Sequence, residues 1–176
     1  SILAGERGLI NRKMMDPQVR KAQYDHIELS WKNAADAWKV YEPLTQTKEE
    51  AVLWKEFVPK WESWKKSSQQ VVDVSREKDN LIASGADPQG KRIEAIDNKA
   101  FEASFASRKN FLVVETLLGK LVDLNIKLGK EANTAGEHES KRAQILLVSA
   151  LVVGILLSLM IGFYLKRNIA SILQGL

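Results

Sequence analysis

Residues 54–64 read WKEFVPKWESW, and this stretch carries three of the five tryptophans in the chain. Its large apolar side chains are spaced by three, four and three residues, at Trp54, Phe57, Trp61 and Trp64. Such spacing places them on one stripe of an α-helix, as in a coiled coil or an antiparallel bundle. A tryptophan stripe is also compatible with a carbohydrate site or an aromatic cage, but heptad spacing favours a core. We therefore predict that these tryptophans form part of the core of a helical bundle.

The same spacing recurs on both sides of this stretch. Upstream, Tyr24, Trp31 and Trp38 lie seven residues apart. Downstream, the alternation of three and four residues continues through Phe111, Val114, Leu118, Leu121, Asn125 and Leu128. No β-strand pattern competes with it, so the sequence predicts an all-α fold, an antiparallel up-down four-helix bundle. Asn125 in this seam either sets the register, as buried asparagines do in coiled coils, or is solvated.

Three sites in the sequence indicate where helices begin. Asp16-Pro17 and Asp87-Pro88 each place an N-cap residue before a proline suited to the first helical position. Thr47 and Glu50 fit a capping box, in which the hydroxyl and the carboxylate each accept a hydrogen bond from a free backbone amide. We therefore predict that helices begin at these three sites.

Two further sites indicate where helices end. The residue before a proline avoids the helical conformation, so Glu42-Pro43 ends the helix before it. Gly85 fits the left-handed position that follows a helix. Together, these boundaries predict helices at about 1–15, 17–42, 47–84 and from 88 onward.

Charge is distributed unevenly along the chain. All 22 acidic residues lie before Lys141, and residues 143–165 carry no charge. About 20 apolar residues suffice to cross a bilayer. We therefore predict that the bundle (residues 1–142) continues into a transmembrane helix at 143–165, followed by a linker at 166–176. Two basic residues flank each end of the apolar segment, which leaves its orientation undecided.

The polar part of the chain, residues 1–142, carries 24 basic and 22 acidic residues. This near balance, with no basic block, gives no support to a nucleic-acid partner. The chain has no cysteine, no glycine-rich phosphate loop, no metal-ligand spacing and no nucleophile–base set. We therefore predict that it is not an enzyme and holds no cofactor. Haem ligation by His26 with Met14 or Met15 is the alternative, but His26 beside an apolar stripe favours an ordinary flanking residue.

Arginines on the first and last predicted helices are candidates for binding a small carboxylate. Arg7 and Arg12 lie near the start of the chain, and Arg108 precedes Phe111. Guanidinium groups that project from facing helices bind carboxylates through paired hydrogen bonds. Arg7 and Arg12 are five residues apart and diverge on one helix, so two guanidinium groups reach one anion more easily from two subunits. The alternative is that all three arginines are solvated surface charges.

Several motifs, taken in order, resemble the four-helix-bundle sensor domain of bacterial methyl-accepting chemotaxis proteins. They are GERGLINR at 5–12, EAVLWKEF at 50–57 and RKNF at 108–111, which leads into LVDLN at 121–125. The similarity covers residues 1–142 and the membrane helix after them. The stretch RNIASIL at 167–173 is similar to the opening of a HAMP linker, although Ile172 stands where that linker usually has proline.

The resemblance implies a homodimer whose first and last helices lie near the two-fold axis. It implies a bundle in the periplasm, anchored in the inner membrane of a Gram-negative bacterium. A small solute, such as an amino acid or an organic acid, or a periplasmic binding protein would bind at the membrane-distal end, with Arg7, Arg12 and Arg108 as the positions that grip it. Because the family begins with a membrane helix before the bundle, the chain is expected to be a fragment with an incomplete first helix.

The predicted function is therefore the sensory module of a transmembrane chemoreceptor. The module would detect an extracellular solute and pass a displacement of its last helix across the membrane to cytoplasmic signalling domains. Two alternatives remain open. The same sensor unit can be attached to a membrane histidine kinase or a diguanylate cyclase, and a membrane-anchored bundle can also be purely structural.

Overall fold

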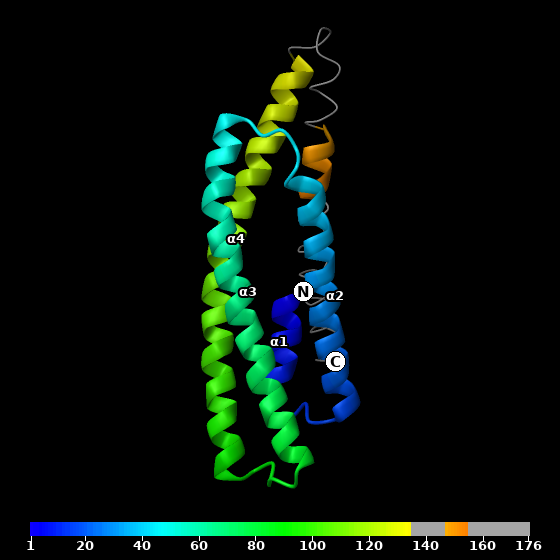
Figure 1. Cartoon of the computed structure of the whole chain (residues 1–176), viewed down its shortest axis with the longest axis vertical. Coiled ribbons are helices and arrows are strands. Elements are labelled where there is room, and N and C mark those ends of the chain that lie inside the picture. Colours follow the sequence, from blue (N-terminus) through cyan, green and yellow to red (C-terminus); the bar gives the residue numbers. More distant parts are fainter. Residues whose placement is uncertain (135–146, 155–176) are drawn as a thin grey trace, which may run out of the picture.

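The computed structural model describes residues 1–134 and 147–154. The helices follow one another in the order α1 (Ile2–Ile10), α2 (Pro17–Tyr41), α3 (Lys48–Ala83) and α4 (Lys91–Thr134). The chain reverses direction at each connecting loop, so that consecutive helices run antiparallel (Figure 1). The described residues contain no strand. The predicted all-α, up-down four-helix bundle is therefore confirmed.

The helices differ greatly in length, and this decides which parts of the bundle they fill. α3 and α4 lie side by side over most of their length, and α4 extends past the α2–α3 loop (Figure 1). α1 has nine residues and contacts α2, α3 and α4. It lies in the half of the bundle nearer the α3–α4 loop (Figure 1). We refer to the two ends of the bundle as the α3–α4 loop end and the α2–α3 loop end.

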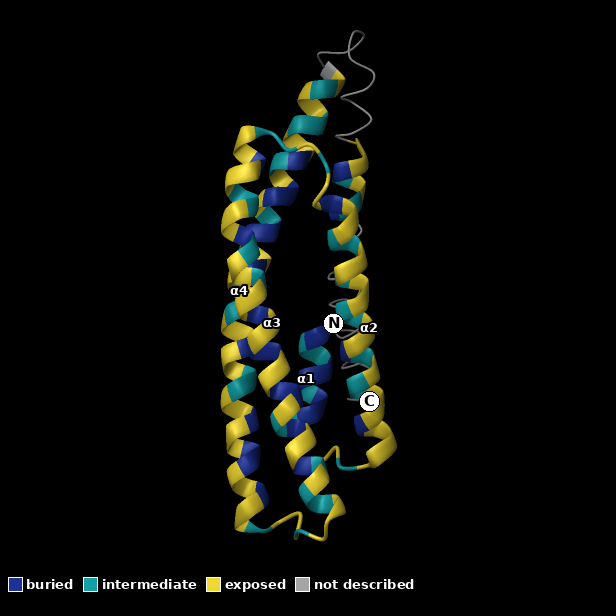
Figure 2. Ribbon diagram, viewed as in Figure 1, coloured by how far each residue is buried: buried dark blue, intermediate teal, exposed yellow. Residues whose placement is uncertain are grey.

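Aromatic side chains join α2 to α3. The buried faces of the helices turn toward one another (Figure 2), and Phe57 and Trp64 are almost completely buried on α3. The ring centroids of Trp31 and Trp64 are 4.8 Å apart, and those of Trp38 and Trp54 are 4.6 Å apart. Aromatic pairs at such distances contribute packing energy beyond the area they bury. The prediction that the tryptophans form part of the core is confirmed for Trp64, and Trp31, Trp38, Trp54 and Trp61 are partly buried and pack against that core.

Two glycines allow α1 to approach α2 closely. A Cβ atom added at Gly5 would lie 2.5 Å from Cγ1 of Ile27, and one added at Gly8 would lie 2.8 Å from the side chain of Gln23. Ile27 is itself buried in the core. Any larger residue at Gly5 would therefore push α1 away from α2.

The predicted caps of α2 and α3 are confirmed. Asp16 precedes Pro17, and its side chain accepts hydrogen bonds from the backbone amides of residues 18 and 19. Thr47 and Glu50 form the reciprocal hydrogen bonds of a capping box. After α3 ends at Ala83, Gly85 adopts a φ of 94°, the left-handed conformation that glycine enters without steric cost.

Two predicted helix boundaries are wrong. α1 ends at Ile10 instead of near residue 15, because Asn11 adopts an extended conformation and its side chain accepts a hydrogen bond from the amide of Lys13. α4 begins at Lys91 instead of Pro88. Asp87 caps a turn there, with its side chain accepting from Gln89 and its carbonyl from Gly90. In both places a short polar side chain bonds to nearby backbone and favours a turn over a helix.

Within residues 1–134 and 147–154, no helix is both long and apolar enough to cross a membrane. Most of the predicted transmembrane segment, 143–146 and 155–165, lies outside the described residues, as does the linker at 166–176. Residues 147–154 are helical. Val153 is buried there in a small cluster with Tyr41 and Val122, whereas Leu147 and Leu151 are exposed. The transmembrane helix stays a prediction.

Candidate functional site

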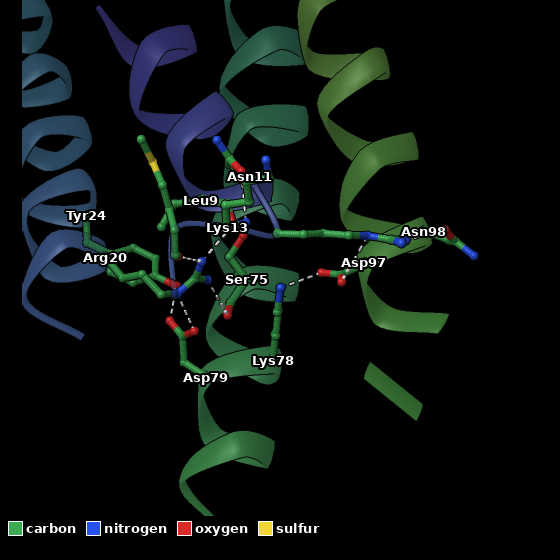
Figure 3. Close-up of polar contacts among 12 residues, drawn as sticks. Leu9, Asn11, Lys13, Arg20, Tyr24, Ser75, Lys78, Asp79, Asp97 and Asn98 are labelled. Carbon is green, nitrogen blue, oxygen red and sulfur yellow. Dashed lines mark hydrogen bonds and ion pairs between the residues drawn. The ribbon is translucent and has the colours of Figure 1, made fainter. Parts of the chain in front are cut away.

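Arg20 is the centre of a buried polar network at the α3–α4 loop end (Figure 3). Its side chain is only 4% exposed, and its Nε atom lies 2.5 Å from Oδ1 of Asp79 on α3. Its Nη1 atom donates to the carbonyl of Leu9 at 2.8 Å, and its Nη2 atom donates to the carbonyl of Ser75 at 3.4 Å. One guanidinium group on α2 therefore binds the end of α1 and two turns of α3.

Tyr24 extends this network along α2. Its hydroxyl group donates to Oδ2 of Asp79 at 2.6 Å, so the carboxylate accepts from both Arg20 and Tyr24 (Figure 3). Burial and the neighbouring carboxylate raise the pKa of Tyr24 far above its ordinary value. The phenol therefore stays protonated and acts as a hydrogen-bond donor at every physiological pH.

A second buried ion pair lies beside the first. Lys78 on α3 is 2% exposed and donates from Nζ to Oδ1 of Asp97 on α4 at 2.6 Å. The other oxygen of Asp97 lies 3.3 Å from Nε of Arg12, whose Nη2 atom donates to Asn98 at 3.2 Å. Arg12 therefore reaches α4 from the loop after α1. The carboxylate of Asp97 thus joins α3, α4 and the α1–α2 loop.

Glu6 lies deeper in the bundle, where α1 faces α3 and α4. It is fully buried, and its Oε1 atom accepts a hydrogen bond from the Ser107 hydroxyl of α4 at 2.9 Å. Its Oε2 atom is buried with no hydrogen-bond partner. Burial raises the pKa of Glu6 to about 7, an effect that the nearby hydroxyl groups of Ser68 and Ser107 partly oppose. Loss of water disfavours the charged form of a carboxyl group, which explains the direction.

The structure places Arg7 and Arg108 at the same level of the bundle. Each follows directly after a member of the hydrogen-bonded pair formed by Glu6 on α1 and Ser107 on α4. Arg7 is half-buried, and its Nη1 atom is buried without a hydrogen-bond partner. Arg108 is exposed, and no ion pair within 1–134 and 147–154 includes it. The two arginines therefore lie next to the same contact between α1 and α4.

Arg12 lies apart from the other two arginines. It contacts α4 at Asp97 and Asn98. Since a helix rises 1.5 Å per residue, Asn98 lies about 15 Å from Arg108 along α4. More than half of the Arg12 side chain is exposed, at 59%, but its guanidinium group already has a carboxylate partner. The structure therefore brings two of the three predicted arginines to one level and places the third near the loop end.

A shallow hollow of about 520 Å³ lies on the outer surface near the end of α3. Its lining includes Arg76 of α3 and Arg92 of α4. None of the three predicted arginines lines it. The hollow is therefore separate from the contact of α1 with α4.

A third buried polar cluster lies at the α2–α3 loop end. Glu50 is 2% exposed, and its Oε1 atom accepts hydrogen bonds from the Tyr41 hydroxyl and, at 3.1 Å, from Nδ2 of Asn125. Asn125 itself is 1% exposed. The alternative that Asn125 is solvated is therefore wrong, and its hydrogen bond to Glu50 fixes α4 against the start of α3.

Most of these buried polar residues were not predicted from the sequence, although a signal for them exists. Lys78 continues the heptad series of Phe57, Trp64 and Val71, and Glu50 begins the same series. Glu6 lies between Ile2 and Leu9 at spacings of four and three, and Arg20 precedes Ile27 by seven residues. The pattern that indicates burial is a charged residue at a position of the apolar heptad series.

The comparison with protein families agrees with the four-helix fold. A family model described as a four helix bundle sensory module for signal transduction matches residues 8–139. No curated protein and no solved structure matches the chain. Because the match covers α2, α3, α4 and the end of α1, the chain belongs to the family of four-helix-bundle sensory modules for signal transduction.

Proposed function

We propose that this sensory module belongs to a transmembrane chemoreceptor and binds a small anionic solute, an amino acid or an organic acid, at the contact of α1 with α4. Binding displaces α4, and the displacement passes through a membrane helix at 143–165 to signalling domains in the cytoplasm. The module lies in the periplasm, forms a homodimer in the inner membrane and performs no catalysis. A periplasmic binding protein that carries the solute would use the same end of the bundle.

The observation that carries this proposal is the position of Arg7 and Arg108, each of which follows a member of the Glu6–Ser107 hydrogen bond in sequence. The hydrogen bond from Ser107 to Glu6 holds α1 and α4 together directly beside both arginines. Arg7 has a buried guanidinium nitrogen without a partner, which is costly unless a ligand or another subunit satisfies it. Two guanidinium groups at one level match the two oxygens of a carboxylate.

An apolar stripe on α4 supports a homodimer. Phe101 and Phe105 are 64% and 68% exposed, and Leu112 and Ile126 are also exposed. At 100° per residue, all four lie within about 60° of one another around the helix, and Arg108 lies on the same stripe. Exposed aromatic rings in a contiguous row are typical of protein interfaces. Pairing of this stripe with its copy would bring Arg108 of both subunits to the interface, where Arg7 of either subunit is near.

The length and packing of α4 suit it to transmit a movement. It spans 44 residues, or about 66 Å. From Ile126 to Asn133 no side chain is buried, so the last part of the helix can shift without disturbing the core. Beyond it, the exposed apolar residues Leu147 and Leu151 leave an apolar surface on the 147–154 helix that a bilayer would cover.

A ligand screen tests the proposal. A panel of amino acids and organic acids is added to the full chain, and the melting temperature is measured, because a ligand that binds only the folded state raises it. A hit should lose its effect in Arg7→Ala and Arg108→Ala but keep it in Lys109→Ala, a neighbouring exposed cation. Arg12→Ala reports whether the third arginine takes part. A hit that survives in all three arginine variants would exclude the arginine site.

A further inference from the structure

Glu6 is a carboxyl group in the apolar stripe of α1. It is fully buried with Leu9 and Ile2 on either side of it in the stripe. It forms no ion pair with any residue that the structure describes. Buried carboxylates normally require a cationic partner or several hydrogen-bond donors. Glu6 has one donor, the hydroxyl of Ser107.

The neutral acid fits this site better than the carboxylate does. Oε2 of Glu6 and the hydroxyl oxygen of Ser68 are both buried, and neither has a hydrogen-bond partner. Ser68 is close enough to influence the pKa of Glu6. The hydroxyl groups of Ser68 and Ser107 favour the charged form of Glu6, but two neutral donors do not offset the water that burial removes, because burial is the largest influence on its pKa. A proton on Oε2 would remove the buried charge while Oε1 continues to accept from Ser107.

The other ionisable groups around α1 have their own partners. From α2, His26 lies 3.0 Å from the amino group of Ser1, and Arg20 donates to the carbonyl of Leu9. From α3, Asp79 is paired with Arg20.

On the α4 side, Asp97 is paired with Lys78 and Arg12, while Arg108 is exposed. Arg7, next to Glu6 in the chain, makes no ion pair with it, and no charged side chain contributes to its pKa shift. Glu6 therefore titrates in an environment set by burial and by hydroxyl groups.

We propose that Glu6 is a proton-binding site that couples the docking of α1 against α3 and α4 to the pH outside the cell. When the proton leaves, a bare carboxylate remains in the core, and α1 must move or admit water to solvate it. The contact that loosens is the one at which α1 meets α4. The use of this proton as a signal rests on the proposed sensory function, whereas the proton linkage itself does not.

The direction of the effect follows from the folded and unfolded pKa values. The pKa of Glu6 is about 7 in the folded chain and 4.5 as its ordinary value. Below pH 4.5 the group is protonated in both states and the folding equilibrium is unaffected. As the pH rises toward 7 the unfolded state loses its proton first, so the folded state becomes less favoured. The full effect on the folding constant is up to about 300-fold and is reached above pH 7.

The test compares the full chain with Glu6→Gln, in which the amide keeps one acceptor and gains donors, as in the protonated acid. Unfolding constants from urea titrations are measured between pH 4.5 and 8 in one non-ionic detergent. We expect the wild-type chain to lose stability relative to Glu6→Gln across this range. His26→Gln removes the histidine that lies 3.0 Å from the Ser1 amino group beside α1, and it should leave the difference intact.

Infrared spectroscopy identifies the titrating group directly. A protonated buried carboxyl band should disappear with a midpoint near pH 7 and should be absent in Glu6→Gln. Glu50→Gln, which changes another buried carboxyl group, should retain the band. The inference is overturned if the wild-type chain and Glu6→Gln show the same pH dependence, or if the band persists in Glu6→Gln.

The ligand screen separates this inference from the proposed function. If the pH dependence requires Glu6 but no solute of the panel binds, the proton site is supported and the proposed solute-binding role is contradicted. If a solute binds but the wild-type chain and Glu6→Gln show the same pH dependence, the sensory role is supported and the proton site is contradicted.

Discussion

Lys78 and Asp97 form the most completely buried ion pair between α3 and α4 among the described residues, with side chains 2% and 8% exposed. Removal of two charges from water costs several kcal/mol per ion, and their attraction offsets this cost only while both are present. The pair therefore adds little net stability compared with apolar residues, but the loss of one member leaves the other charge buried alone. This asymmetry can be measured.

We predict that Asp97→Asn destabilises the chain by about 3–5 kcal/mol, because Lys78 would keep its charge without a carboxylate partner. Asp25→Asn is the matched control, since Asp25 pairs with Lys21 on the exposed surface of α2. That change should cost at most about 1 kcal/mol. Urea denaturation measures both. Equal costs for the two variants would show that the Lys78–Asp97 pair is solvated.

At the residue scale, the sequence predicted the apolar stripes correctly but not the charges within them. Phe57 and Trp64 were recognised from their spacing, and both are buried. Lys78 occupies the same series and is buried equally well, yet hydropathy alone would place a lysine at the surface. Its burial depends on Asp97, 19 residues away on another helix. To predict such a pair, one must know which residues of α3 and α4 lie at the same level of the bundle. The spacing of apolar residues within one helix does not give that information.

The contact between α1 and α2 depends on the absence of side chains at two positions. Gly5 faces Cγ1 of the buried Ile27, and Gly8 faces the side chain of Gln23. Ile27 is β-branched and held in the core, so it cannot move aside easily. By contrast, a Cβ added at Gly129 of α4 would meet no atom within 4 Å.

Substitution by alanine should change the stability of the chain in opposite directions at Gly5 and at Gly129. Gly5→Ala should destabilise the chain by about 1–3 kcal/mol, because overpacking outweighs the better helix propensity of alanine. Gly129→Ala should stabilise α4 by about 0.5–1 kcal/mol, the usual gain from replacing glycine within a helix. Thermal unfolding of both variants checks the prediction. Stabilisation by Gly5→Ala would mean that α1 does not pack closely on α2.

At the element scale, the residues that follow an Asp-Pro pair determine whether a helix begins there. Asp16-Pro17 and Asp87-Pro88 look alike in sequence, but only the first begins a helix. In the second, Gly90 follows two residues after the proline and closes a turn onto the carbonyl of Asp87. The choice between a helix cap and a turn depended on that glycine, which the dipeptide pattern did not include.

At the scale of the whole molecule, the exposed apolar stripe on α4 is the surface through which we propose that two copies of the chain meet. We predict that Phe105→Cys forms a disulfide-linked dimer under mild oxidation, because the stripe would meet its own copy across a two-fold axis. The natural chain has no cysteine, so the cross-link reports this position alone. Val52→Cys is the control, since Val52 on α3 is equally exposed at 68%. Equal cross-linking of the two variants would contradict the α4 interface.

The candidate site could be predicted only in part at this scale. Arg7, Arg12 and Arg108 were chosen because arginine binds carboxylates, and that choice remains a prediction. Their arrangement depends on the hydrogen bond between Glu6 and Ser107, 101 residues apart. It also depends on α1 ending at Ile10, which places Arg12 in a loop beside Asp97. Neither feature can be read from the spacing of the arginines.

We propose that a solute bound where α1 meets α4 moves α4 relative to the rest of the bundle. Spin labels on cysteines introduced at Lys39 of α2 and Lys127 of α4, both exposed, measure this movement directly. With a solute from the screen, the distance between the labels should change by about 1–2 Å, the size of helix shifts in signalling interfaces. Arg108→Ala should abolish the change. An unchanged distance at saturating solute would contradict the account.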